Sequence, residues 1–437
     1  MGGTAVKTGR YAYHYTTDGR VRFSSSHQPL DDRLFRARGS AIERNLSPAP
    51  PPPDWAQDLL RIAKAVYLAD KLSGRELAPD RWTRTIELSV QVIDPDRWHH
   101  AAPTLTALLE ILTADRWSIR FHSGAARHPG VQGRLLDDAR VEEVSLFSGG
   151  LDSTAYAAER VQQAGGPLLL VSYYDPTLKR RQEQILDHLR RLRSRPVEHR
   201  AVLLQSRANG VRLDRSSRSR GLLFLATAVF AAAAHRARQV AVPENGQLAV
   251  NPPLTAARVA ACSTRSVHPR TLDLVNDLIN SAEGDVRVEN PLLPATKGEV
   301  CRRARDLGLP LAALMVTVSC GQSPCKFGGA SRPHHCGHCY PCLIRQSGLL
   351  AGVGHDDTPY ETDVWALPTT DRKAQHLRAL RAWLAASFGV RDLTTDLPLP
   401  PQTDTASLLR TLVRGREELR NLFARHGGQS PGSSPSL

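Results

Sequence analysis

The stretch SLFSGGLDSTAYAAERV, residues 145–161, decides the fold because it leads an apolar strand straight into a helix through two adjacent glycines. Residues 141–147 predict a buried strand, and apolar residues recur at helical spacing from Ser153 onward. Gly149 and Gly150 can adopt backbone conformations closed to residues with a Cβ atom. That freedom lets successive N–H groups converge on an anion at the start of a helix. The sequence therefore predicts a phosphate-binding loop.

Polar side chains complete this loop. Two serine hydroxyls flank the glycines, and Asp152 is placed to hold Mg²⁺ beside a polyphosphate. A Walker loop would have a lysine before its closing serine or threonine, and none is present, which favours pyrophosphate as the ligand. The alternative is a plain capped turn. We expect the nucleotide and its metal to be bound by Ser148, Gly149, Gly150, Leu151, Asp152 and Ser153.

Bulk composition places the chain among soluble globular proteins. Of its 437 residues, 41% are hydrophobic and 23% charged, which suffices for two or three domains with at least one sizeable core. No stretch approaches the roughly 20 apolar residues of a membrane span. The first residues lack the apolar core of a signal peptide. We therefore expect a cytoplasmic protein without a membrane partner.

The formal net charge of +14 raises the question of nucleic-acid binding. The arginines are scattered among alanine, leucine and proline rather than gathered into one run with interleaved aromatic residues. Contacts with phosphates or with an acidic protein explain such a distribution equally well. A nucleic-acid partner is possible but not favoured.

The pattern of elements changes near residue 139. We expect an α+β accessory domain at residues 1–138, in which residues 11–26 form a hairpin, and a helical region at 362–426 before a disordered tail at 427–437. Between them, at 139–361, apolar strands alternate with helices and predict a doubly wound parallel sheet whose ligand lies at the carboxyl ends of the strands, near the switch point. The predicted strands are residues 141–147, 166–174, 196–204, 238–245 and 285–293.

Cysteines form a second constellation. Cys336, Cys339 and Cys342 follow one another in two C-x-x-C steps, and a reducing cytosol favours a structural zinc site over disulfides. An iron–sulfur cluster and free thiols are the alternatives. Cys320 is the preferred fourth ligand because it ends an apolar, strand-like run at 314–319. The other candidates for the fourth position are Cys325, His334, His335 and His338.

The two constellations together carry a family resemblance. The S-G-G-L-D-S loop resembles the PP-loop of ATP pyrophosphatases. Residues 141–352 as a whole are similar to 7-cyano-7-deazaguanine synthase (QueC), through the apolar helix at 219–234, the segment NPLLPATKGEV at 290–300, and a metal-site motif. That motif comprises Ser319, Cys320, Cys336, Gly337, Cys339, Cys342 and Arg345.

The resemblance implies a chemistry and a set of roles. ATP adenylates the carboxylate of 7-carboxy-7-deazaguanine, and an amine then attacks the mixed anhydride. Asp152 serves the metal, and Arg220 and Lys297 steady charge on the α-phosphate, although a solvated arginine and a helix-start lysine are equally good interpretations. Tyr173 and Tyr174 end the second strand and are candidates for the adenine pocket, unless they pack on the sheet. Glu244, Asn245 and His268 are candidates for the deazapurine, with a core role more probable for His268.

Two departures from that family affect the functional hypothesis. The chain is about twice as long as the members that work alone, and VPENGQLAVNPPL, residues 242–254, replaces their aspartate-containing purine segment. The chain is similar instead to extended QueC-like proteins of Qat-type anti-phage systems. That resemblance implies an ATPase, a small partner protein and a TatD-like nuclease as partners, and an amine on a partner protein as acceptor. The alternatives are an ammonia-using synthase, a PP-loop tRNA-modifying enzyme and an inactive nucleotide-binding module.

Overall fold

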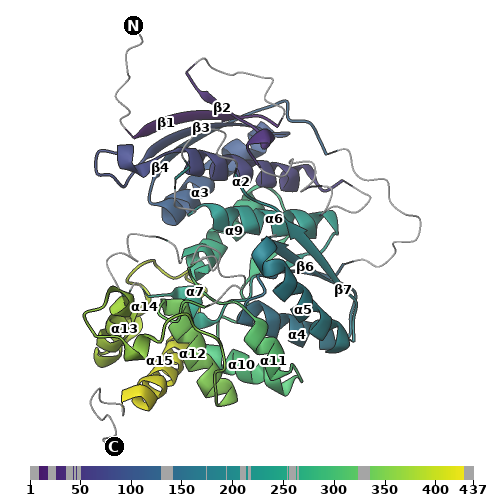
Figure 1. Ribbon diagram of the computed structural model, residues 1–437. Coiled ribbons are helices and arrows are strands. Elements are labelled where there is room, and N and C mark those ends of the chain that lie inside the picture. Colours follow the sequence, from purple (N-terminus) through teal and green to yellow (C-terminus); the bar gives the residue numbers. More distant parts are fainter. Residues whose placement is uncertain are drawn as a thin grey trace, which may run out of the picture.

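A computed structural model gives the fold of the protein (Figure 1). Its chain runs from the N-terminal strands, drawn in purple, to the C-terminal helix, drawn in yellow. The structure describes residues 9–17, 26–35, 43, 46, 51–128, 141–173, 175–192, 194–206, 213, 214, 218–252, 254, 262, 265–322 and 335–427.

The N-terminal region forms a four-stranded sheet in the order β2-β1-β3-β4, and every pairing in it is parallel. The expected hairpin is therefore wrong for β1, which pairs in parallel with β2 and with β3; residues 18–25, its predicted second arm, lie outside the described part. Side-chain alternation indicates which face of a strand is buried, not the direction of its partner. The elements are β1 (Arg10–Tyr15), β2 (Gln28–Leu30), α2 (Asp54–Leu72), β3 (Thr85–Gln91), α3 (Pro95–Thr113) and β4 (Arg116–His122).

A second sheet, of five parallel strands, confirms the predicted α/β class. Its order is β7-β6-β5-β8-β9, so the chain reverses its direction of winding between β5 and β8. Ligands of such sheets bind outside the carboxyl ends of the strands at this switch point. The strands are β5 (Glu143–Leu146), β6 (Leu168–Tyr173), β7 (Val197–Val202), β8 (Gln239–Ala241) and β9 (Arg287–Glu289).

Helices cover both faces of the second sheet. Helix α6 is apolar nearly all round and buries twelve of its fifteen residues. The sequence explains where these helices start and end; for instance, Thr296 and Glu299 form the capping box expected at the start of α10. The helices are α4 (Leu151–Gln162), α5 (Pro176–Leu192), α6 (Arg220–Ala234), α7 (Gly246–Val250), α9 (Pro269–Ser281), α10 (Lys297–Asp306) and α11 (Leu311–Val316).

One apolar core joins the two sheets. Helices α2 and α3 of the N-terminal region pack on α6 and α9 of the second sheet, and buried side chains run without interruption from Tyr13 to Val288 (Figure 1). The N-terminal region therefore covers one face of the second sheet's helical layer rather than hanging from it by a linker.

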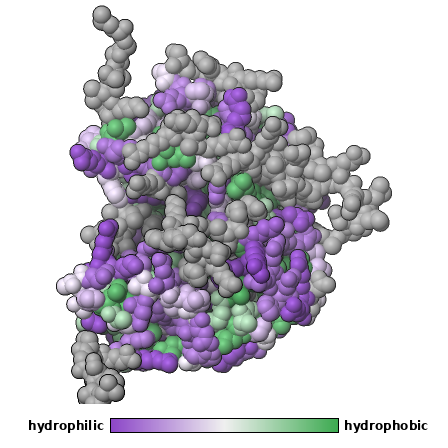
Figure 2. Space-filling model, viewed as in Figure 1, coloured by the Kyte–Doolittle hydropathy of each residue, from purple (hydrophilic) through white to green (hydrophobic). Residues whose placement is uncertain are grey.

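The C-terminal helices lie at the opposite end of the molecule from the first sheet (Figure 1). They are α12 (Tyr340–Val353), α13 (Gln375–Ala385), α14 (Val390–Leu393) and α15 (Thr405–Gly427). On the face drawn in Figure 2, polar side chains predominate and apolar ones lie in small groups. Within the described ranges, no helix combines the length and apolarity that a membrane crossing requires.

Candidate functional site

The loop between β5 and α4 has the geometry of an anion cradle. Gly149 adopts a left-handed backbone conformation (φ +75°) that strains any residue with a Cβ atom. Gly150 precedes the first turn of α4, and its N–H donates to Ser148 Oγ at 3.1 Å. The hydroxyls of Ser148 and Ser153 share a hydrogen bond of 3.2 Å. The structure thus gathers the predicted loop residues at the positive end of a helix, beside the switch point.

Asp152 belongs to a buried ion pair. Lys297 Nζ, at the start of α10, donates to Asp152 Oδ2 at 2.6 Å, and Asn245 Nδ2 donates to the same oxygen at 2.9 Å. Asp152 and Lys297 expose only 5% and 1% of their surface, so water screens the pair weakly. Burial acts to raise the pKa of Asp152, but the Lys297 ammonium and the hydrogen bonds outweigh it and hold that pKa below its ordinary value.

Glu244 adds a second carboxyl group to the pair. Burial and the Asp152 carboxylate raise the pKa of Glu244 well above its ordinary value. Asn245 Nδ2 also contacts Glu244 Oε1, at 3.2 Å. Asp152 Oδ1 is buried and lacks an N–H partner among the described residues. Two carboxyl groups in this position can be satisfied by one shared proton or by a divalent cation, so the residues fit Mg²⁺.

A cavity of about 270 Å³ opens from the loop along the carboxyl ends of the strands. Its volume lies near the lower end of the range of small-molecule pockets, about 300–1,000 Å³. Arg220, the first residue of α6, is exposed and lies with its guanidinium 5.6 Å from the ring of Phe224, which lines the cavity. The lining residues include Ser148, Ser153, Ser172, Tyr173, Phe224 and Glu244.

The remaining predicted site residues are Tyr174 and His268. Tyr174 lies outside the described residues, while its neighbour Tyr173 lines the cavity. His268 is buried and caps the start of α9, where its Nδ1 accepts from Arg270 N at 3.1 Å. Burial lowers the pKa of His268 to about 4, so its ring is neutral at physiological pH.

Sequence reasoning missed two residues that hold Lys297. Gln247 Oε1 accepts from the backbone N–H of Lys297 at 2.9 Å, and Glu418 of α15 accepts from the next N–H, that of Gly298, at 3.1 Å. These contacts join residues 50 and 120 positions apart. No local motif marks either residue.

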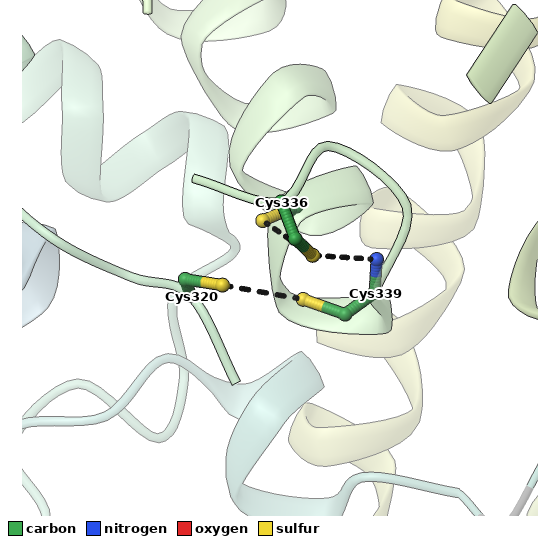
Figure 3. A group of neighbouring side chains, drawn as sticks. Cys320, Cys336 and Cys339 are labelled. Atoms are coloured by element: carbon green, nitrogen blue, oxygen red, sulfur yellow. Dashed lines mark hydrogen bonds between the residues drawn. The ribbon is translucent and has the colours of Figure 1, made fainter. Parts of the chain in front are cut away.

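The four cysteines form a compact cluster. Figure 3 shows three of them, Cys320, Cys336 and Cys339, with their side chains close together. All four Sγ atoms lie within 4.8 Å of one another; Cys320 and Cys339 are 4.0 Å apart, and Cys336 and Cys342 are 3.9 Å apart. Sulfur atoms 2.3 Å from zinc at tetrahedral corners are about 3.8 Å apart. The cluster can therefore hold zinc in a closed site with four thiolate ligands.

The expected reason for choosing Cys320 is wrong, although the residue lies in the cluster. Residues 314–319 do not form a strand, because helix α11 continues through Val316 and an irregular segment follows. Two alternatives to Cys320, Cys325 and His334, lie outside the described residues. The other two histidines have different partners: His335 Nε2 accepts from Ser319 N, and His338 Nδ1 contacts the carbonyl oxygen of Cys336.

The cysteine segment touches the loop at 148–153 directly. Val318, two residues before Cys320, donates its N–H to Gly149 O at 3.1 Å. Arg345 of α12 is buried and donates to Thr317 Oγ1 at 2.8 Å, so α12 also anchors this segment. A closed metal site here would therefore support the backbone of the loop.

Comparison with known proteins covers part of this site. Residues 266–352 match the family described as "Queuosine biosynthesis protein QueC", so the chain carries a QueC-family domain that includes Lys297, the four clustered cysteines and Arg345. The loop at 148–153 precedes the matched residues. The resemblance expected for residues 141–352 is thus borne out for its C-terminal part.

Individual relatives match over similarly short stretches. The 7-cyano-7-deazaguanine synthase of Pyrococcus abyssi is 33% identical over 90 residues, 20% of this chain and 36% of that protein. The synthase of Pyrococcus horikoshii is 37% identical over 75 residues, 17% of this chain and 30% of that protein. The matched stretch thus spans about a third of the length of these relatives. A ketoreductase domain from the bacillaene assembly line aligns with 66% of this chain and 82% of its own, but its TM-score of 0.23 and 9% identity are too low to relate the folds.

Proposed function

We propose that this protein is an ATP-dependent enzyme that adenylates the carboxylate of 7-carboxy-7-deazaguanine and passes the acyl group to an amine. The observation that carries the proposal is the buried Asp152–Lys297 pair, which joins the loop at the switch point to the QueC-family domain. Such a domain would contribute positioning and charge stabilisation rather than covalent chemistry of its own.

In the first step, a carboxylate oxygen of the substrate attacks the α-phosphorus of ATP. The bond to the bridging oxygen breaks, and pyrophosphate leaves with the bonding electrons. The N–H groups of the first turn of α4, just after Gly150, bind the departing pyrophosphate. Lys297 stabilises the charge that develops on the α-phosphate, and Arg220 assists from the cavity rim.

The carboxyl pair fits a magnesium ion. Asp152 Oδ1 and Glu244 would hold it, and Mg²⁺ supplies positive charge that neutralises the phosphate oxygens of ATP. Binding a cation requires Glu244 to give up its proton. The cavity then takes the base and ribose of ATP against Tyr173 and Phe224.

In the second step, an amine attacks the acyl carbon and loses a proton, and AMP leaves. Asn245 remains a candidate for contact with the deazapurine because it lies beside Asp152, whereas Glu244 is assigned above to the magnesium ion. His268 is a weak candidate, since its ring caps α9. The amine belongs to a partner protein in an anti-phage system; the residues on both sides of the QueC-family domain supply area for such a partner.

Incubation of the purified protein with ATP, Mg²⁺ and 7-carboxy-7-deazaguanine tests the proposal. We expect release of one pyrophosphate per adenylated carboxylate, and a mass increase on a co-purified or co-expressed partner protein. Conversion to the nitrile with ammonia alone would identify an ammonia-using synthase instead. Absence of pyrophosphate release under all these conditions would overturn the adenylation step itself.

A further inference from the structure

One face of the C-terminal helix α15 is built against the start of α10, the helix that carries Lys297. Three residues of α15, spaced three or four positions apart, contact this region. The segment that they meet, residues 294–299, runs up to and past the lysine. The three are Thr411, Arg414 and Glu418.

Glu418 lies at the centre of this contact. Its carboxylate accepts a hydrogen bond from Thr296 Oγ1 and another from Gly298 N, at 3.1 Å. Thr296 and Gly298 are the two chain neighbours of Lys297. Glu418 thus binds the side chain of the residue before the lysine and the backbone N–H of the residue after it, an N–H that the first turn of α10 leaves without a helical partner.

The backbone of Lys297 itself is held through a second residue. Gln247 Oε1 accepts from Lys297 N at 2.9 Å. A Cβ atom on Gly415 would lie 2.4 Å from the Gln247 side chain, so any larger residue there would have to displace Gln247. Arg414 adds an ion pair with Glu299, 2.6 Å between Nε and Oε1.

We propose that Glu418 is a positioning residue that holds the Lys297 ammonium against Asp152 and the phosphate loop. The Lys297 side chain is fully buried, and its Nζ lies 2.6 Å from Asp152 Oδ2, so the direction of the side chain follows the backbone of residues 296–298. A displacement of about 1 Å at a reacting centre can reduce a rate about 100-fold. The role in turnover rests on the function proposed above, whereas the role in holding the ammonium does not.

The ammonium can be observed without turnover. The sequence contains seven lysines, so ¹⁵N-lysine labelling gives few signals, and Lys297→Met identifies the one of interest. In Glu418→Gln we expect a shifted Lys297 ammonium signal and at least tenfold faster proton exchange. Glu417→Gln is the matched control, because Glu417 is the exposed neighbour that pairs with Arg420. An ammonium signal that is the same in both variants would overturn the proposal.

Kinetics then separate positioning from general stabilisation. For pyrophosphate release we expect Glu418→Gln to lower kcat about tenfold, with the KM for ATP changed less than about twofold and wild-type turnover in Glu417→Gln. In the Lys297→Met background, Glu418→Gln should cause no further loss, because it acts through the lysine. An equal loss in both backgrounds would contradict the proposal. If wild-type protein releases no pyrophosphate, the proposed function fails, while the ammonium signal still decides this inference.

Discussion

The Asp152 cluster and the cysteine cluster both adjoin the loop at 148–153, yet the chain assembles them differently. The cysteines all come from residues 320–342. Asp152, in contrast, meets partners that are 93 and 145 residues away. The first cluster needs its local segment and a metal, whereas the second needs the whole parallel sheet. Changes in the two should therefore have different consequences.

The largest effect is expected at the cysteines. Cys339→Ser removes one of four thiolate ligands, and binding of a structural metal is part of folding. We expect the loss of about one zinc per chain and most of the yield of folded protein. Cys301→Ala, at a buried cysteine of α10 outside the cluster, should keep the metal. Metal analysis alongside circular dichroism checks both variants, and a folded, zinc-free Cys339→Ser protein would be incompatible with a structural site.

The second effect concerns turnover. Asp152→Asn keeps the shape of the side chain but removes its charge, so we expect pyrophosphate release to fall by about 10³-fold or more. It also leaves the Lys297 ammonium buried without its partner, which costs about 3–5 kcal/mol of stability. Adding Lys297→Met should restore the melting temperature but not the turnover. Wild-type turnover in Asp152→Asn would refute the assignment of the loop.

The third effect is a pH dependence of stability at the edge of the Asp152 cluster. Burial raises the pKa of Glu418 from 4.5 to about 7, so between these values the folded state binds more protons than the unfolded state. Stability should therefore fall as pH rises through this window, by at most about 3 kcal/mol from this group. Glu299, Cys301 and Arg302 of α10 face the same carboxyl group.

Glu418→Gln isolates this dependence from that of other groups. Urea unfolding between pH 5 and pH 8 should show a smaller decline for the variant than for the wild type. Parallel curves for the two proteins would mean that Glu418 does not titrate in this range.

Comparison of the clusters also shows what the sequence can predict. The loop at 145–161 and the C-x-x-C steps could be predicted from the sequence because their geometry depends on neighbouring residues. Glu418 was not, because an amphipathic pattern identifies the buried face of α15 but not the helix that it meets. The run at 314–319 has strand-forming residues, but tertiary packing placed its first half in α11.

The smallest effect is expected at the cavity rim. Arg220 is exposed, and its guanidinium lies over Phe224 rather than among the buried charges. Arg220→Gln should therefore raise the KM for ATP about threefold and leave the melting temperature nearly unchanged. Steady-state kinetics check this, with Arg238→Gln, at an arginine just before β8, as the control. A loss as large as that of Asp152→Asn would move Arg220 into the centre of the site.

The shared core has a consequence for shortening the protein. Removing the N-terminal region would strip α2 and α3 from α6 and α9, and α6 alone buries twelve residues, nearly all apolar. The remaining two thirds of the chain would expose a large apolar surface and would aggregate rather than fold as a smaller enzyme. A minimal catalytic version of this chain must therefore redesign the outward side of α6, not simply begin near residue 139.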